Sequence, residues 1–264
     1  MSDQDAARIQ DVYEDPKIVD LYDRQHECEP PERGLMHLLG AELARMDMLD
    51  IGVGAGRTAR HFGPAVRSYL GVDYSAGMIE RCRLRFPQFS FAVGDARRLD
   101  FVKDGSTDLV MFSFCGIDNA DAGDRALILC EMVRVLRPGG VLVVSSHNTN
   151  DIGSLLERYR FKFSLNPRQL YRSLYWWIVF FRHNPHLAFG KLGDMPRVFT
   201  DSHDYRSEVT YIRPAAQVAA LRALGLVDIR CAERDSETYV ECSDHVLARV
   251  GTAWLHYFAR KPAA

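Results

Sequence analysis

The stretch 49–60, which reads LDIGVGAGRTAR, decides how the rest of the chain can be organised. A short apolar run ends in Gly52, Gly54 and Gly56, and a helix is expected to start at Thr58. Glycines at this spacing let the chain turn sharply and let bare backbone approach a ligand, while the following helix offers unpaired N–H groups. The stretch therefore predicts a loop between a strand and a helix that cradles a nucleotide-like ligand.

The glycine spacing separates this loop from two other nucleotide-binding loops. A dinucleotide fingerprint needs a third glycine where this chain has Arg57, and a P-loop needs Gly-Lys-Ser/Thr after its glycines, which is absent here. The pattern that remains is Asp-x-Gly-x-Gly-x-Gly, from Asp50 to Gly56. It resembles the first motif of class I S-adenosylmethionine-dependent methyltransferases, and the resemblance implies S-adenosylmethionine as the cofactor.

Short apolar segments alternate with helical patterns after this loop begins. Strands are expected at 48–51, 68–72, 89–93, 109–112 and 141–145, and helices at 58–63, 76–85 and 124–136. This alternation favours an α/β fold with a mainly parallel sheet covered on both faces. The resemblance implies a doubly wound, seven-stranded, Rossmann-like sheet with an inserted helical cap, completed by an antiparallel hairpin of strands at 227–232 and 252–260.

Ligands of such sheets bind outside the carboxyl ends of the strands. The second expected strand ends in Asp73, whose carboxylate can accept hydrogen bonds from both ribose hydroxyls. Asp73 is not needed as the cap of the next helix, because Ser75 is available for that role. In the resembling family, the acid at Asp95 accepts from the adenine amine and the next backbone N–H meets a ring nitrogen. The resemblance thus implies a cofactor-binding set of Asp50, Gly52, Gly54, Gly56, Asp73, Tyr74, Met78, Asp95 and Ala96.

A Leu-Arg-Pro-Gly-Gly turn at 136–140 resembles the family's junction between its fourth helix and fifth strand. The glycine loop, Asp73, the Gly-Asp-Ala segment at 94–96 and this turn occur in the family's order, so the resemblance covers 46–147. The expected parts of the chain are N-terminal helices over the cofactor pocket at 1–45, an α/β core at 46–148 and 211–264, and an inserted aromatic and basic cap at 149–210.

The insert mixes arginine and lysine with tyrosine, tryptophan and phenylalanine. This composition fits a cap that binds the substrate, a dimer interface, a membrane-surface helix or a nucleic-acid platform. We favour the cap, because family members with small substrates often carry an inserted lid at this place. A homodimer through 149–210 and simple core packing are the main alternatives. A membrane partner is not expected, and neither is a nucleic acid, because a net charge of -2 gives no global basic field.

Methyl transfer from a sulfonium demands mainly positioning, and it needs a base only where the acceptor carries a proton. His147 follows the fifth strand on the acceptor side and is the candidate catalytic base, although a histidine here can also simply pair with a backbone carbonyl. No metal site is expected, since His183 and His186 lack recognisable further ligands. The candidate substrate-binding residues are Asp118, His147, His203 and Tyr211.

The segment 115–119 reads Cys-Gly-Ile-Asp-Asn, where amino-group methyltransferases of nucleic acids carry Asn/Asp-Pro-Pro-Tyr/Phe. This difference argues against methylation of a nucleobase amino group. We therefore expect S-adenosylmethionine-dependent methyl transfer to an oxygen, nitrogen or carbon atom of a small molecule. An RNA methyltransferase that uses the insert and a non-catalytic cofactor-binding module are the alternatives.

The cysteines and the apolar segments indicate a cytoplasmic location. The six cysteines contain no C-x-x-C pair and are expected to be reduced thiols. The acidic amino terminus is not followed by the apolar stretch of a secretion signal. The longest apolar run, 174–181, is far shorter than the roughly 20 residues needed to span a bilayer.

Overall fold

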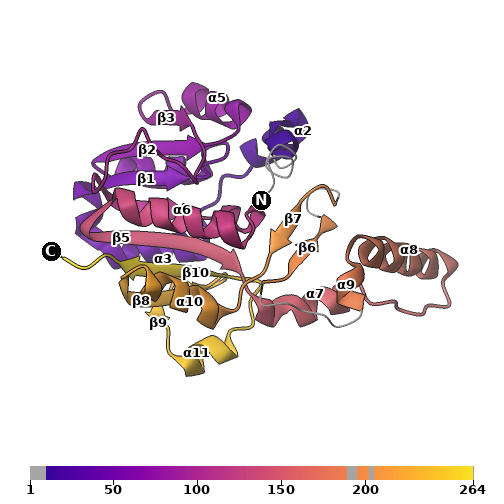
Figure 1. Ribbon diagram of the computed structural model, residues 1–264. Helices are drawn as coiled ribbons and strands as arrows, with labels where there is room; N and C mark the ends of the chain where they lie inside the picture. Colours follow the sequence, from indigo (N-terminus) through magenta and orange to yellow (C-terminus); the bar gives the residue numbers. More distant parts are fainter. Residues whose placement is uncertain (1–9, 189–194, 202–204, 264) are drawn as a thin grey trace.

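An eight-stranded sheet forms the centre of the computed structural model, which describes residues 10–188, 195–201 and 205–263 (Figure 1). In chain order the strands are β1 (Asp47–Ile51), β2 (Ser68–Asp73), β3 (Ser90–Val93), β4 (Thr107–Phe112), β5 (Leu136–His147), β8 (Val227–Glu233), β9 (Val240–Glu241) and β10 (Trp254–Arg260). Their order across the sheet is β3-β2-β1-β4-β5-β10-β8-β9. The first five strands of this order, from β3 across to β5, pair in parallel, and β10 is antiparallel to both β5 and β8. The sheet is therefore mainly parallel and Rossmann-like, as expected.

The sheet has one strand more than the seven expected. The additional strand, β9, pairs with the edge strand β8 through Arg230 with Glu241 and Cys231 with Val240. A strand of two residues is too short for the alternation of apolar and polar residues, over about four or more positions, by which strands are recognised in a sequence. The seven longer strands lie where the sequence places them.

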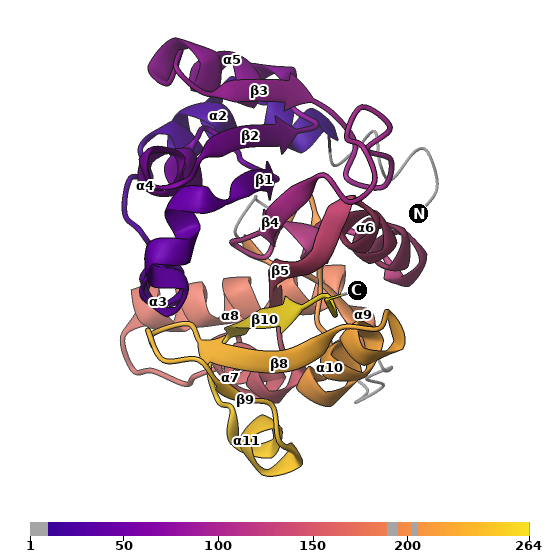
Figure 2. The same ribbon diagram turned by 90° about the vertical axis from the view of Figure 1, so that its left-hand side faces the viewer.

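Helices cover both faces of the sheet (Figure 2). One face carries α3 (Pro30–Leu39), α4 (Arg57–Phe62) and α5 (Ala76–Arg85), and the other carries α6 (Ala122–Val135), α10 (Pro214–Ala223) and α11 (Asp244–Arg249). Leu49 and Ile51 of β1 pack on the α6 side and Met48 packs on the α4 side, because successive strand side chains point to opposite faces. The strand order changes direction between β1 and β4, which favours a ligand crevice at their carboxyl ends.

The Pro-Gly-Gly turn expected at 136–140 lies at the junction of α6 and β5 and forms an irregular first part of that strand. β5 begins at Leu136, which pairs with Thr107 of β4. The backbones of the two glycines bond to Lys261, with N···O distances of 2.9 Å. The next pair after Leu136–Thr107 joins Val141 to Leu109, and Gly139 has a φ value of 79°, so the chain does turn here within an irregular start of β5.

The N-terminal segment approaches the sheet edge beside α5. Residues 10–14 are helical, and α2 (Pro16–Asp23) follows. Asp15 caps α2 by accepting a hydrogen bond from the Lys17 N–H at 3.0 Å, and Pro16 fits the first turn because its missing N–H has no partner to lose there. Figure 1 shows α2 next to α5.

The inserted segment leaves the sheet at the end of β5 and has a small core of its own. After a 3₁₀ turn (Thr149–Asp151) it contains α7 (Ile152–Arg158), α8 (Pro167–His183), α9 (Pro185–Ala188), β6 (Arg197–Phe199) and β7 (Glu208–Thr210). Tyr159 stacks on Phe180, with ring centroids 4.1 Å apart. Figure 1 shows α8 far out from the sheet, while the β6–β7 hairpin lies closer to it. Thr210 Oγ1 of β7 donates to the Ala120 carbonyl at 2.8 Å, so the hairpin, rather than α8, is the part of the insert beside the crevice.

The cysteines and helices agree with two further expectations. All six cysteines lie within the described residues and are free thiols. Among the described residues, no helix is long and apolar enough to cross a membrane.

Candidate active site

The loop after β1 exposes bare backbone at the carboxyl ends of the strands. Gly52 and Gly54 have φ values of 65° and 54°, in the left-handed region that favours glycine. A Cβ on Gly52 would lie 2.4 Å from the ring of Phe112, whereas one on Gly54 would come no closer than 3.7 Å to Tyr22. Gly52 therefore packs against β4, and Gly54 is the glycine that opens toward the crevice.

Asp50 and Gly56, two of the expected cofactor residues, support this loop from within the fold. Asp50 is buried and accepts hydrogen bonds from the hydroxyls of Thr58 and Tyr69. Burial raises the pKa of Asp50 to about 7, against the opposing effect of these hydroxyls. A Cβ on Gly56 would lie 2.7 Å from the ring of Phe86. We therefore interpret Asp50 and Gly56 as residues that position the loop.

Asp73 lies at the end of β2 and holds the glycine loop. Its Oδ2 accepts from the Gly54 N–H at 2.9 Å, and its Oδ1 accepts from the Ser75 N–H at 2.9 Å. Ser75 caps α5 by accepting from the Met78 N–H at 3.2 Å, so the helix does not depend on Asp73 as its cap. Burial raises the pKa of Asp73 to about 6, although both backbone donors favour the charged form. The carboxylate thus lies beside the bare backbone of the loop.

Six of the expected cofactor residues line one crevice at these strand ends: Gly52, Gly54, Asp73, Tyr74, Met78 and Ala96. Asp95 borders an adjoining hollow of about 120 Å³ that shares Tyr74 and Ala96 with the crevice. The Asp95 carboxylate pairs with Arg97 at 2.6 Å. Asp95 must leave this partner, or share it, to reach an adenine amine.

Tyr13 and Tyr22 of the N-terminal segment fill part of the crevice, with ring centroids 5.8 Å apart. Ser75 Oγ donates to the Tyr13 carbonyl at 3.1 Å, and the Glu14 carboxylate accepts from the Ala76 N–H at 2.7 Å. The remaining space has a volume of about 90 Å³. Ligand pockets usually have roughly 300–1,000 Å³, so this cover must move aside before a nucleoside-sized ligand can enter.

A second cavity, of about 260 Å³, adjoins the crevice and receives side chains from the ends of β4 and β5. The two spaces share Tyr13, Tyr22, Phe114, Cys115 and Asn119. Phe114 and Cys115 have φ values of 57° and 58°, a backbone conformation that costs energy in residues other than glycine and that clusters at functional sites. Neither residue can be recognised from the sequence as part of the site, because a strained turn without glycine has no sequence signature.

Asp118 and His147 form a hydrogen-bonded pair in the wall of this second cavity. His147 Nδ1 lies 2.9 Å from Asp118 Oδ2, and the same oxygen accepts from the His147 backbone N–H at 2.7 Å. The side chain of Asp118 is 1% exposed and that of His147 is 25% exposed, so the ring borders the cavity and the carboxylate lies behind it. With Nδ1 held by the carboxylate, Nε2 is the ring nitrogen that can accept a proton.

Arg125 of α6 balances the buried charge of Asp118. Arg125 Nη1 donates to Asp118 Oδ1 at 2.7 Å, and Ser146 Oγ donates to the same oxygen at 2.6 Å. The second terminal nitrogen of Arg125 donates to Gln217 Oε1 of α10 at 2.6 Å. Arg125 therefore holds Asp118 in place and, through it, His147. Removal of Arg125 would leave the buried charge of Asp118 uncompensated. Arg125 was not expected from the sequence, because its partners lie far from it along the chain.

Cys115, Asp118 and His147 place potential metal-ligand atoms within 4.8 Å of one another. Both Asp118 oxygens already accept two hydrogen bonds each. Burial raises the pKa of the Cys115 thiol well above its usual range, which disfavours the thiolate that metal binding requires. We therefore interpret this cluster as a hydrogen-bonded pair beside a neutral thiol.

Tyr211, expected to bind the substrate, lies against His147 with ring centroids 5.2 Å apart. It is buried in the core of the insert and is absent from the lining of the second cavity. The structure thus places Tyr211 behind His147, where it packs on the ring. His203, the other expected residue of the insert, lies outside the described residues.

Part of this chain is similar to known methyltransferases. The family described as "Methyltransferase domain" matches residues 48–140. The demethylmenaquinone methyltransferase of Beutenbergia cavernae is 37% identical over 117 residues, which cover 44% of this chain and 47% of that protein. Residues 48–140 therefore carry a methyltransferase domain. The matched part of the chain spans about half the length of these curated relatives.

Two solved structures share the fold of the methyltransferase domain and of most of the chain around it. A methyltransferase of Thermotoga maritima, described as a possible histamine N-methyltransferase, covers 97% of this chain and 99% of its own at 18% identity, with a TM-score of 0.58. A protein in a complex described as DhpI-SAM-HEP matches over 98% of this chain and 99% of its own. The two are 18% identical, with a TM-score of 0.61. At this level of identity the likeness shows the fold alone.

The crevice residues fit S-adenosylmethionine, the cofactor of this family. Gly54 offers bare backbone, and Asp73 offers a carboxylate at the end of β2, where a ribose can bind. The buried Tyr74 hydroxyl lines the crevice without a hydrogen-bond partner among the described residues, so it is available to a ligand. Gly54, Asp73 and Tyr74 are therefore our candidates for direct contact with the cofactor.

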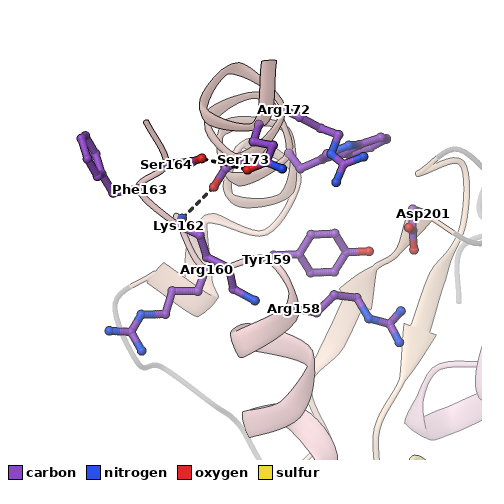
Figure 3. A pocket seen from close by; sticks show the side chains of 11 residues that line it. Arg158, Tyr159, Arg160, Lys162, Phe163, Ser164, Arg172, Ser173 and Asp201 are labelled. Atoms are coloured by element: carbon purple, nitrogen blue, oxygen red, sulfur yellow. Dashed lines mark hydrogen bonds between the residues drawn. The ribbon is translucent and has the colours of Figure 1, made fainter. Parts of the chain in front are cut away.

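A larger hollow, of about 590 Å³, lies in the insert below α8 (Figure 3). Its lining includes Arg158, Tyr159, Lys162, Arg172, Trp176 and Asp201. Figure 3 shows Tyr159 extending into the space below α8, whereas Phe163 points away from it. None of its lining residues is shared with the crevice or the second cavity, so the insert has a concave, mainly cationic surface of its own.

Proposed function

We propose that the protein transfers the methyl group of S-adenosylmethionine to a small molecule bound beside His147. The observation that carries this proposal is the Asp118–His147 pair, which lines a cavity that shares Phe114 and Cys115 with the cofactor crevice. When bound, S-adenosylmethionine supplies a methyl group on a cationic sulfur, a group that needs positioning more than activation.

The residues of the second cavity would hold the acceptor and receive its proton. Tyr22, Phe114 and Trp254 give this cavity aromatic walls, which suit a flat, partly apolar molecule. His147 Nε2 would accept a proton from a hydroxyl, an amine or an acidic carbon of the acceptor, and Asp118 would stabilise the resulting imidazolium. The curated relative from Beutenbergia cavernae is named for demethylmenaquinone. By analogy we propose a cyclic acceptor with an ionisable group.

The parts of the chain keep their proposed roles within this function. We propose that residues 1–45 cover the cofactor, that 46–148 and 211–264 bind it, and that the insert reaches the acceptor through Val209, which lines the second cavity. A cytoplasmic location and a homodimer through 149–210 stay predictions.

Isothermal titration with S-adenosylmethionine and S-adenosylhomocysteine tests the cofactor assignment. Both should bind, and the absence of binding at high micromolar concentration would refute it. Asp73→Ala should weaken binding about 10- to 100-fold, because it removes charge-assisted hydrogen bonds. Asp235→Ala changes a carboxylate whose side chain is 82% exposed, and it should leave the affinity unchanged.

Incubation of cyclic hydroxylated and aminated compounds with methyl-labelled S-adenosylmethionine tests the transfer itself. Mass spectrometry should detect a labelled product that is lost in the Asp73→Ala variant. Tight cofactor binding without turnover across the panel and in cell extracts would favour the non-catalytic alternative.

A further inference from the structure

The outward face of α8 is an apolar stripe without a cover among the described residues. Tyr171, Leu174, Tyr175 and Ile178 follow the i, i+3, i+4, i+7 spacing of one helix face. They are 70%, 43%, 47% and 50% exposed, and Phe180 is the one buried residue of this 17-residue helix. The opposite side of α8 lines the hollow of the insert. An apolar face of this kind on a long exposed helix indicates an interaction surface.

The same segment carries positive charge without any negative charge. Residues 158–183 contain no aspartate or glutamate, although the whole chain has 35 acidic and 33 basic residues. Their basic residues are Arg158, Arg160, Lys162, Arg168, Arg172 and Arg182. Arg168 and Arg182 lie toward the two ends of the apolar stripe, and no described carboxylate pairs with either guanidinium. The partner of this surface should therefore be anionic.

The chemistry of the stripe favours one anionic partner over the others. A second copy of the chain would set arginine against arginine, since α8 has no acid to pair with them. A nucleic acid would stack on tyrosine rings, but Leu174 and Ile178 offer no flat face to a base. The headgroup region of an anionic bilayer accepts aliphatic side chains, aromatic rings and arginines together.

We propose that α8 docks the protein on the surface of an anionic lipid bilayer. The helix would lie along the surface, with Leu174 and Ile178 toward the acyl chains, the tyrosines at headgroup level and the arginines on the phosphates. This proposal does not depend on methyl transfer. It revises the sequence-based expectation that no membrane takes part, because it concerns a helix that lies on the membrane and does not cross it.

Flotation of the full chain with lipid vesicles tests this proposal. The protein should float with vesicles of mixed phosphatidylcholine and phosphatidylglycerol, bind pure phosphatidylcholine much more weakly, and dissociate as the salt concentration rises. The double variant L174S/I178S should reduce the partition coefficient roughly tenfold or more, because it removes half-exposed apolar area from the docked face. The double variant R168Q/R182Q should reduce it by roughly 10- to 30-fold.

Matched controls and competing partners make the outcome decisive. Leu84→Ser on α5, at a leucine that is 75% exposed, and Arg45→Gln should both bind vesicles as the unchanged protein does. Equal losses in these controls, or no vesicle binding at low salt, would overturn the proposal. It would also be overturned if a polyuridine oligonucleotide bound more tightly than vesicles and bound equally to L174S/I178S, or if sedimentation showed a dimer that L174S/I178S dissociates.

Discussion

The cofactor crevice and the second cavity adjoin each other but are built in different ways. In the crevice, backbone N–H groups hold Asp73, and the Gly54 donor is 19 positions away in the chain. In the second cavity, His147 depends on Asp118 and Arg125, and Arg125 bonds to Gln217, 92 positions away. The first site therefore rests on local backbone geometry and the second on a buried network of side chains. Variants should separate the two.

Replacing Arg125 should have the largest effect, and it should act through the second cavity. Arg125→Leu leaves the buried Asp118 charge without its cation, so we expect a loss of about 3–5 kcal/mol in the free energy of unfolding. Urea denaturation measures this loss. Arg98→Leu is the control, because the Arg98 side chain is 80% exposed and its pairing with Asp100 should add little stability. Similar losses in both variants would contradict the network.

Replacing His147 should stop the chemistry while leaving the cofactor crevice intact. His147→Gln should lower kcat by about 10²- to 10⁴-fold, since the base is lost, with little change in the Kd for S-adenosylmethionine. His183→Gln, on α8, should leave both quantities unchanged. Label transfer and isothermal titration measure the two quantities. An unchanged kcat in His147→Gln would show that the acceptor needs no base.

The pH should affect the crevice through Asp73. Burial raises the pKa of this carboxyl to about 6, so it takes up a proton as the pH falls through that value. The charged form accepts hydrogen bonds from ribose hydroxyls better than the protonated form does. The affinity for S-adenosylmethionine should therefore be constant above about pH 6 and fall about tenfold per unit below it. In Asp73→Asn the titration curve should lose this step, and a flat curve in the unchanged protein would contradict the assignment.

Loosening the cover of the crevice should have the smallest effect. Glu14→Ala removes the bond from Ala76 that holds the N-terminal segment on α5. More of the protein should then be open, so S-adenosylmethionine should associate about two- to fivefold faster in stopped-flow experiments. Glu80→Ala, on the exposed side of α5, is the control. A slower association in Glu14→Ala would mean that the segment guides the cofactor in.

The sequence predicted the mainly parallel sheet and most of the crevice because their signals are local. The glycine loop and Asp73 occupy the ends of consecutive strands, so strand alternation and glycine spacing suffice to place them. The same local signals did not reveal that β5 already begins at Leu136, which pairs with Thr107 before the turn, or that the two-residue strand β9 is present. The sequence suggested Asp118 and His147 as substrate-binding candidates but did not show that they bond to each other.

The sequence by itself therefore determined the fold class and the cofactor family, because glycine conformations and strand ends depend on neighbouring residues. The tertiary structure alone decided that Arg125 and Gln217 support Asp118 and that α8 leaves an apolar face uncovered among the described residues. These features arise where segments far apart in the chain meet or fail to meet, and spacing along the sequence does not encode such contacts.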